Sequence, residues 1–280
     1  SAPMHLDDIQ TGDTLLESAP QYESILAISP NHQWLATNGC DETGLECQIR
    51  VWDLNTIKPT LKNTSQGVGV ICSNCTSSAL SSNGRWLVLG GAQKSALQDG
   101  VPNDDIMSEP VEFVTVWDVQ NDRLLDLPIS GNDVVTMAFS PVEDILATMD
   151  WDGIIKLWSP ENGFSSPIEL PIGKTVMVSD LDRIAFSPDG SRLAATAWGL
   201  DSTESVQIGS LRVYDVQSHQ LLREYDPSSA DLLPGVVRFE FAPDGKSMFV
   251  VTEGDVGSTS VDERFRPGPQ IERWAVDTLK

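Results

Sequence analysis

The stretch "IAFSPDGSRLAATA", residues 184–197, decides the fold. Two runs of small and apolar residues flank the tetrapeptide Ser-Pro-Asp-Gly. Proline at the second position of a tight turn presets φ, and the Asp-Gly pair that follows suits the rest of the turn. The stretch therefore predicts two buried antiparallel strands joined by a tight turn.

This pattern occurs five times along the chain. The other copies are "LAISPNHQWLATNG" (26–39), "SALSSNGRWLVLGG" (78–91), "MAFSPVEDILATMD" (137–150) and "FEFAPDGKSMFVVT" (239–252). A third run, which alternates in polarity and carries an aromatic residue near its end, follows each copy. These third runs are "QIRVWDLNT" (48–56), "FVTVWDVQN" (113–121), "GIIKLWSPENG" (153–163), "SLRVYDVQS" (210–218) and "QIERWAVDT" (270–278).

A polar turn and a weaker fourth strand, such as residues 221–225, complete each unit. Repeated four-stranded units without sustained helical periodicity predict an all-β fold, a β-propeller of four-stranded antiparallel blades. We expect one domain over 1–280, with five recognisable blades. The unit boundaries fall at about 22–65, 66–130, 131–172, 173–228 and 229–280.

The motifs "FSPDG", "LAATA", "LRVYD" and "IRVWD" resemble those of the Trp-Asp (WD) repeat β-propellers. The resemblance covers about residues 22–278 and implies an interaction platform. Members of that family often carry a Gly-His pair whose histidine joins a network with Ser or Thr, Asp and Trp. None of the three histidines here, His5, His32 and His219, precedes a first strand, so we expect stability to rest on packing instead.

The two ends of the chain both resemble partial units. Residues 1–21 read as the end of a third strand, a turn and a fourth strand. In the WD-repeat family an N-terminal strand commonly completes the last blade, so residues 12–20 are expected to pair with the strand at 270–278. A small closed ring and a segment of a six- to seven-bladed ring both fit this pattern.

The charge of the chain excludes several classes of partner. The formal net charge is −23, from 18 basic and 41 acidic residues, which disfavours binding to nucleic acid or to anionic lipid. Without an apolar run of about 18 residues, the sequence predicts no membrane insertion. We expect a neutral or basic protein or peptide partner.

The extra length of the units falls between their second and third strands. These loops run over 39–46, 92–110, 198–209 and 253–269, whereas the third unit keeps the short turn "MDWDG". Because such loops project from one face of a propeller, that face is the predicted binding face. The candidate binding residues are Trp151, Trp198, Asp104, Asp105, Arg264, Phe265 and Arg266.

Plainer interpretations of these residues stay open. Each of the two tryptophans can instead pack on an adjacent blade or cover its own hairpin. The acidic loop 98–110 contains carboxylates of the kind that bind Ca²⁺, but it lacks the spacing of a known calcium loop, which favours a solvated loop. We therefore predict no metal site and no cofactor.

The four cysteines, Cys40, Cys47, Cys72 and Cys75, all lie in the first part of the chain. Cys40 and Cys47 flank a hairpin loop, and a disulfide between them is the first hypothesis. A structural zinc site and four free thiols are the alternatives. The compartment, cytoplasmic or extracytoplasmic, stays undetermined for a protein expected to be soluble, and bridged cysteines would favour the extracytoplasmic one.

The sequence favours a binding module over an enzyme. It contains no Gly-x-Ser-x-Gly elbow, phosphate loop or His-Glu-x-x-His motif. The predicted function is a non-catalytic scaffold that binds a protein or peptide on its loop-rich face. The alternatives are a hydrolase or lyase-type propeller enzyme that uses paired carboxylates, and a sensor or regulatory segment of a larger multidomain protein.

Overall fold

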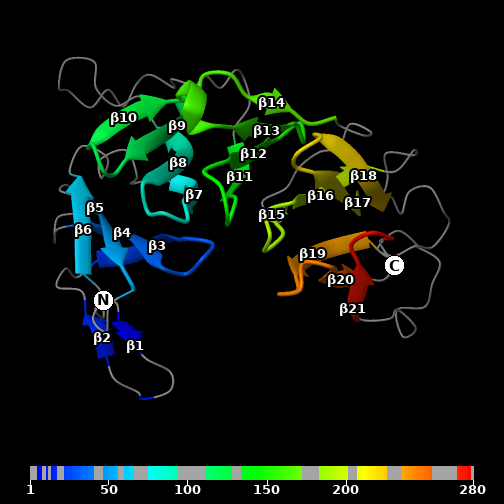
Figure 1. Ribbon diagram of the computed structural model, residues 1–280, viewed down its shortest axis with the longest axis horizontal. Coiled ribbons are helices and arrows are strands. Elements are labelled where there is room, and N and C mark those ends of the chain that lie inside the picture. Colours follow the sequence, from blue (N-terminus) through cyan, green and yellow to red (C-terminus); the bar gives the residue numbers. More distant parts are fainter. Residues whose placement is uncertain are drawn as a thin grey trace, which may run out of the picture. The chain divides into compact units, whose positions relative to one another are not determined.

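The computed structural model describes most of the repeat strands and fewer of the connections. The described residues are 5–7, 11, 14–17, 22–40, 47–55, 60–65, 75–93, 111–127, 134–171, 183–200, 207–225, 235–253 and 270–278. They form β-strands and one short 3-10 helix, η2 (Pro160–Asn162). The chain divides into two compact units, residues 1–133 and 134–280, and each is described separately below (Figure 1).

Unit 1 contains a hairpin and two four-stranded antiparallel sheets among its described residues. The hairpin joins β1 (His5–Asp7) to β2 (Thr14–Glu17). The first sheet has the order β3-β4-β5-β6, and the second has the order β7-β8-β9-β10. Their strands are β3 (Tyr22–Ile28), β4 (Trp34–Cys40), β5 (Cys47–Asp53), β6 (Thr60–Ser65), β7 (Cys75–Leu80), β8 (Trp86–Gln93), β9 (Val111–Asp118) and β10 (Arg123–Asp126).

Unit 2 contains three further antiparallel sheets among its described residues. The third and fourth sheets have four strands each, β11 to β14 and β15 to β18, and the fifth has three, β19 to β21. Their strands are β11 (Val134–Phe139), β12 (Leu146–Asp150), β13 (Ile155–Trp158), β14 (Ile168–Glu169), β15 (Ile184–Phe186), β16 (Arg192–Leu200), β17 (Gln207–Asp215), β18 (Gln220–Tyr225), β19 (Gly235–Phe241), β20 (Ser247–Glu253) and β21 (Gln270–Ala275).

The turn after the first strand of each sheet has the local chemistry that its sequence predicts. In the fourth sheet the hydroxyl of Ser187 donates to Asp189 Oδ1 at 2.6 Å and accepts the backbone N–H of Arg192 at 2.9 Å. Gly190 follows with φ +71°, a left-handed conformation that glycine adopts without strain. The same serine hydroxyl contacts hold the turns that begin at Ser29 and Ser81.

Neighbouring turns also contact one another within each unit. A Cβ added to Gly190 would lie 2.3 Å from Val142 Cγ2, and one added to Gly84 would lie 2.3 Å from the ring of Trp34. Asn31 donates its side-chain N–H to the carbonyl oxygen of Ser82 at 2.6 Å. The glycine of the turn therefore has two roles, a positive φ and room for the preceding turn to pack.

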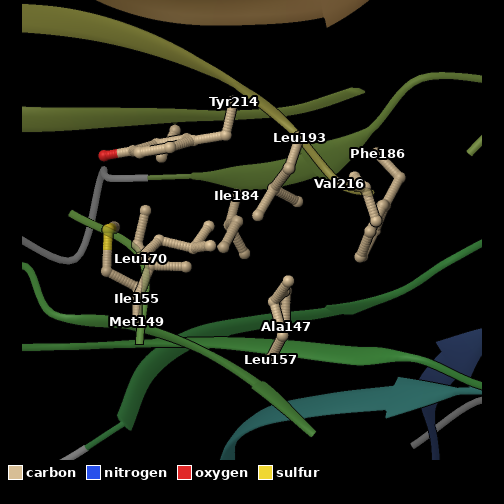
Figure 2. Packing of buried hydrophobic residues seen from close by; sticks show 11 residues of the cluster. Ala147, Met149, Ile155, Leu157, Leu170, Ile184, Phe186, Leu193, Tyr214 and Val216 are labelled. Atoms are coloured by element: carbon tan, nitrogen blue, oxygen red, sulfur yellow. The ribbon is translucent and has the colours of Figure 1, made fainter. Parts of the chain in front are cut away.

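The sheets pack face to face through buried apolar side chains. In unit 2, Ala147, Met149, Ile155, Leu157 and Leu170 of the third sheet and its flank meet residues of the fourth sheet, as Figure 2 shows. The fourth sheet and the residue that follows β17 contribute Ile184, Phe186, Leu193, Ala195, Tyr214 and Val216 to this cluster. Alternate residues of the fourth sheet point the other way and pack on the fifth sheet. That alternation is the strand periodicity from which the buried strands were predicted.

The aromatic residue of the third strand has a polar partner that is not a histidine. Trp158 donates its indole N–H to Thr148 Oγ1 at 2.9 Å, and Trp52 donates to Thr37 Oγ1 at 3.0 Å. The hydroxyl of Tyr214 donates to the carbonyl oxygen of Pro171 at 3.2 Å. The polar tip of each of these aromatics is satisfied, as burial requires. That stability rests on packing in place of a histidine-containing network stays a prediction.

The all-β class and the antiparallel repeat units are confirmed, as five sheets of three or four strands among the described residues. The opening residues form a hairpin in which Thr14–Glu17 pairs with His5–Asp7. The expected pairing of residues 12–20 with the strand at 270–278 stays a prediction, because these segments belong to different compact units.

Candidate functional site

Every sheet has two ends, which are distinguished by the strands that they connect. At one end, which we call the turn end, tight turns join the first and second strands. At the other, the loop end, the second strand connects to the third through residues 41–46, 94–110, 201–206 and 254–269 in four sheets. These four connections lie outside the described residues. In the third sheet the same connection is only residues 151–154, and the structure describes all of it.

The side chain of Asp150 organises this short connection. Its Oδ1 accepts the backbone N–H of Ile154 at 2.9 Å and that of Asp152 at 3.1 Å. The Asp150 carbonyl oxygen accepts the N–H of Gly153, which has φ +73°. Burial raises the pKa of the Asp150 carboxyl, and the N–H of Ile154 offsets part of that effect. Asp150 is therefore a structural residue of the turn.

Trp151 lies at the exposed corner of the same turn. It is 40% exposed, and the neighbouring Asp152 is exposed as well. The other described tryptophans with an assigned burial lie on strands and are buried or half-buried. An exposed indole offers an apolar face that suits an apolar or cationic side chain.

Trp198 does not lie in a connection, and the prediction that it does was wrong. It is part of β16, where it pairs in register with Gly209 of β17. The two strands of this hairpin continue to Leu200 and Gln207. The sequence "AWGLDSTESVQIGS" therefore contains the ends of both strands, and the loop between them is shorter than the predicted loop 198–209. The glycine and serine residues of this hairpin are typical of loops, so the sequence did not predict that the strands extend this far.

Most of the other candidate binding residues cannot be placed. Asp104, Asp105, Arg264, Phe265, Arg266 and Cys72 lie outside the described residues. Their role on a binding face stays a prediction.

The structure describes the backbone of three of the four cysteines, Cys40, Cys47 and Cys75. Cys40 ends β4 and pairs in register with Cys47, the first residue of β5. Cys75 is the first residue of β7, so it belongs to the strand and not to the segment before it. The register places Cys40 and Cys47 directly opposite each other, and the disulfide between them stays a prediction.

Sequence reasoning did not identify the ion pairs at the turn end. Arg85 reaches Asp118 with two hydrogen bonds, at 3.0 and 3.3 Å, and Arg192 contacts Asp215 at 2.5 Å. In the fifth sheet the roles are exchanged, since Arg273 on the third strand reaches Asp244 of the turn at 2.7 Å. The signal was present in the sequence as an arginine after the turn and an aspartate after the aromatic residue.

These contacts lower the pKa of several turn-end carboxyls. For Asp118, burial disfavours the charged form, but hydrogen bonds from Arg85 and Asn121 outweigh it, so the pKa is lowered. A hydrogen bond from Ser187 lowers the pKa of Asp189, and the backbone N–H of Ser218 lowers that of Asp215. These carboxylates are bonded within their own sheets, which indicates a structural role.

The described residues contain neither a metal-binding cluster nor a membrane-spanning helix. No group of three or more His, Cys, Asp or Glu side chains among them could hold a metal ion. Within the same residues, no helix has the length and apolar character needed to cross a membrane.

Comparison with known proteins finds similarity to a repeat family and to a protein that is named for its tryptophans. Residues 125–159 match the family model described as "WD domain, G-beta repeat". This segment runs from β10 to the residue after Trp158, that is, from a fourth strand through the first three strands of the following sheet. The Periodic tryptophan protein 2 homolog of Mus musculus is 33% identical over 107 residues, which are 35% of this chain and 11% of that protein. The match thus spans about a tenth of the length of this relative.

Proposed function

We propose that this chain, a member of the WD40 repeat family, is a non-catalytic scaffold that binds a protein or peptide at the loop end of its sheets. The observation that carries the proposal is the contrast between the two ends. The turn end is closed by short turns whose polar groups bond to one another, whereas two connections at the loop end, residues 94–110 and 254–269, are much longer than any connection at the turn end.

The rigidity of the sheets supports this function. Third-strand residues such as Val51, Val116 and Val213 are 0% exposed, so the strands that carry the loops are fixed by packing. A loop whose ends are held in this way loses less conformational entropy when it binds. Function on loops supported by rigid strands is a common arrangement.

Trp151 is the best candidate for an anchor at the loop end. Tryptophan is enriched among the residues that dominate binding energy, and this one presents 40% of its surface in a turn that Asp150 holds in place. The partner that fits is a peptide segment with an apolar or cationic side chain, in accord with the net charge of −23. Arginine or lysine over the indole face would also lie close to the carboxylate of Asp152.

A peptide array tests the proposal. Immobilised peptides of varied sequence, including basic ones, are probed with the labelled full chain and with a variant in which residues 254–269 are replaced by a short Gly-containing turn. We expect a subset of peptides to bind the full chain, and the graft to weaken at least part of that subset tenfold or more. Equal binding profiles for both proteins would contradict the assignment to this loop.

The control is one substitution at the turn end, Ser191→Lys, which gives the fourth-sheet turn the sequence "PDGK" of the fifth sheet (243–246). It removes the hydroxyl contact of Ser191 with Asp189 and leaves that of Ser187. This control is expected to keep the full profile. Binding lost in the control and retained in the loop graft would place the site at the opposite end.

A further inference from the structure

Cys40 and Cys47 form the last pair of the ladder that joins β4 to β5, directly before the connection at residues 41–46. The backbone alone determines what kind of pair this is. In an antiparallel ladder, pairs of residues that exchange backbone hydrogen bonds alternate with pairs that do not. One hydrogen bond of known position therefore identifies every other pair of the ladder, as long as the register does not shift.

A hydrogen bond at the turn end of this ladder identifies the pairs. The backbone N–H of Leu54 donates to the carbonyl oxygen of Gln33 at 2.8 Å, so these two opposite residues are a hydrogen-bonded pair. From there the register continues without a shift, and Cys40 with Cys47 is the seventh pair after it. Since hydrogen-bonded pairs recur at every second step, Cys40 and Cys47 are a non-hydrogen-bonded pair.

The third sheet follows the same alternation. There the N–H of Asp150 donates to the carbonyl oxygen of Ile154 at 3.2 Å. Asp150 has the place in β12 that Gly39 has in β4, counted from the residue that pairs with the tryptophan of the third strand. Gly39 therefore belongs to a hydrogen-bonded pair, and the next pair, Cys40 with Cys47, again exchanges no backbone hydrogen bonds.

A non-hydrogen-bonded pair suits a disulfide. Its Cα atoms lie about 4.5 Å apart, and its side chains are closer than those of a hydrogen-bonded pair. A disulfide accepts Cα separations of about 4.4–6.8 Å. Directly opposite residues also belong to the same face of a sheet. The backbone of the hairpin therefore holds Cys40 and Cys47 at a separation that a disulfide spans without backbone movement.

The packing of the first sheet keeps this hairpin in place. By strand alternation, Ile49 and Val51 share the face of β5 to which Cys47 belongs. Both are 0% exposed and lie in the apolar cluster between the first and second sheets. Because this burial does not depend on a covalent link, we expect the two cysteines to stay opposite each other in the reduced and the oxidised protein.

The repeat unit does not require cysteine at this place. The equivalent pairs, counted in the same way, are Ala92 with Glu112 in the second sheet and Trp198 with Gly209 in the fourth. Neither of these pairs can form a disulfide. The opposite cysteines are therefore a feature of the first sheet and not of the repeat.

We propose that Cys40 and Cys47 are a reversible dithiol–disulfide pair that exchanges with a small disulfide such as oxidised glutathione. One cysteine thiolate attacks a sulfur of the small disulfide and releases one thiol. The second cysteine thiolate attacks the resulting mixed disulfide, forms the bond between Cys40 and Cys47, and releases the other thiol. The protein gives up two electrons and two protons, and the small disulfide receives both.

The oxidised protein thus gains a covalent bond across the ends of residues 41–46, which strand pairing alone holds in the reduced protein. The ladder also keeps the second cysteine beside the first, so its attack is intramolecular and favoured over attack by a free thiol. The mixed disulfide with glutathione should therefore not accumulate. The proposal is independent of the peptide-binding function proposed above.

Peptide mapping of the full chain tests the proposal. The protein is equilibrated with reduced or with oxidised glutathione, its free thiols are alkylated, and it is digested without reduction by trypsin and a glutamate-specific protease. Glu42 and Glu46 lie between the two cysteines, so cleavage after them separates Cys40 from Cys47 unless a disulfide joins them. We expect the linked peptides after oxidised glutathione, and their loss after treatment with dithiothreitol.

Two variants are the matched controls. Cys47→Ser combined with Gln48→Cys keeps the number of cysteines and moves the partner of Cys40 by one residue, to the other face of β5. This variant should form no link to Cys40. Cys72→Ser combined with Cys75→Ser should keep the link between Cys40 and Cys47, since both changes fall on the separate tryptic peptide 63–85. Circular dichroism should show native strand content for each variant.

Three results would overturn the proposal. The first is a wild-type chain without linked peptides in oxidised glutathione. The second is equal linking in the variant with the shifted cysteine, which would mean that the register does not control the reaction. The third is Zn²⁺ that the reduced wild type retains in dialysis and that Cys72→Ser with Cys75→Ser loses, because the cysteines would then be ligands of a metal site.

Discussion

Trp158 and Thr148 are joined by a hydrogen bond of 2.9 Å between the indole N–H and the hydroxyl oxygen, and the side chains of both are almost completely buried. Trp52 and Thr37 repeat this relationship in the first sheet. The bond links the third strand to the second and fixes the orientation of the aromatic residue. It corresponds to the threonine–tryptophan part of the network that the WD-repeat resemblance implies, without the histidine.

Thr148→Val should destabilise the protein by about 1–3 kcal/mol, because the substitution keeps the shape but leaves a buried N–H without an acceptor. Urea unfolding followed by tryptophan fluorescence or circular dichroism measures the change. In a Trp158→Phe background the same substitution should cost much less, since the donor is already absent. An equal cost of Thr148→Val in both backgrounds would mean that the bond contributes nothing.

Gly190→Ala should destabilise the protein by more than Gly163→Ala, although both glycines have a positive φ. Alanine at 163 meets nothing within 4 Å, so it costs about 1–2 kcal/mol of backbone strain. Alanine at 190 adds a clash with Val142. Thermal unfolding compares the variants. Val142→Ala should recover part of the loss in Gly190→Ala and none of it in Gly163→Ala, and an equal response would contradict the packing role of Gly190.

Low pH should destabilise the protein, because it protonates the Asp118 carboxylate at the turn end. Its pKa is lower in the folded state than in the unfolded chain. The stabilisation is therefore complete above the unfolded value near 4 and is lost as the pH falls through the folded pKa. Asp118→Asn should cost about 2 kcal/mol at pH 7 and less at pH 3. Urea unfolding at a series of pH values measures this difference.

Asp150→Asn is the control for Asp118→Asn, because the folded-state pKa of Asp150 is raised and not lowered. Because burial raises the folded pKa of Asp150, wild-type stability gains from this group as the pH falls through that raised value. The asparagine oxygen can still accept the N–H of Ile154 and hold the turn. The variant should therefore lack this gain at acid pH and keep its stability at neutral pH. A stability loss at pH 7 as large as that of Asp118→Asn would contradict the assignment.

The strands were predictable because each carries its own local signal. Ser-Pro-Asp-Gly at 187–190 specifies a tight turn, and the alternation in "LRVYD" specifies which side chains are buried. Strand ends were less predictable. The extension of β16 through Trp198 to Leu200 depends on pairing with β17, and small or polar residues in that hairpin resemble a loop.

Side-chain contacts and side-chain exposure were less predictable than the fold. Arg85 and Asp118 are 33 residues apart, so their positions after the turn and after the aromatic residue are visible in the sequence but their contact is not. The exposure of Ile271 was also unpredictable, since its sequence context matches that of the buried Leu211 and only the neighbouring sheet distinguishes them. Trp151 was recognisable because the turn that carries it is short and its ends are strands.

The central claim, a binding surface at the loop end, depends most directly on Trp151. The measurement is isothermal titration of the tightest peptide from the array into wild type, Trp151→Ala and Ile168→Ala, the last at a residue of similar exposure on β14 of the same sheet. We predict at least a tenfold weaker affinity for Trp151→Ala, consistent with loss of an anchor residue, and wild-type affinity for Ile168→Ala. Equal affinities for wild type and Trp151→Ala would contradict the account.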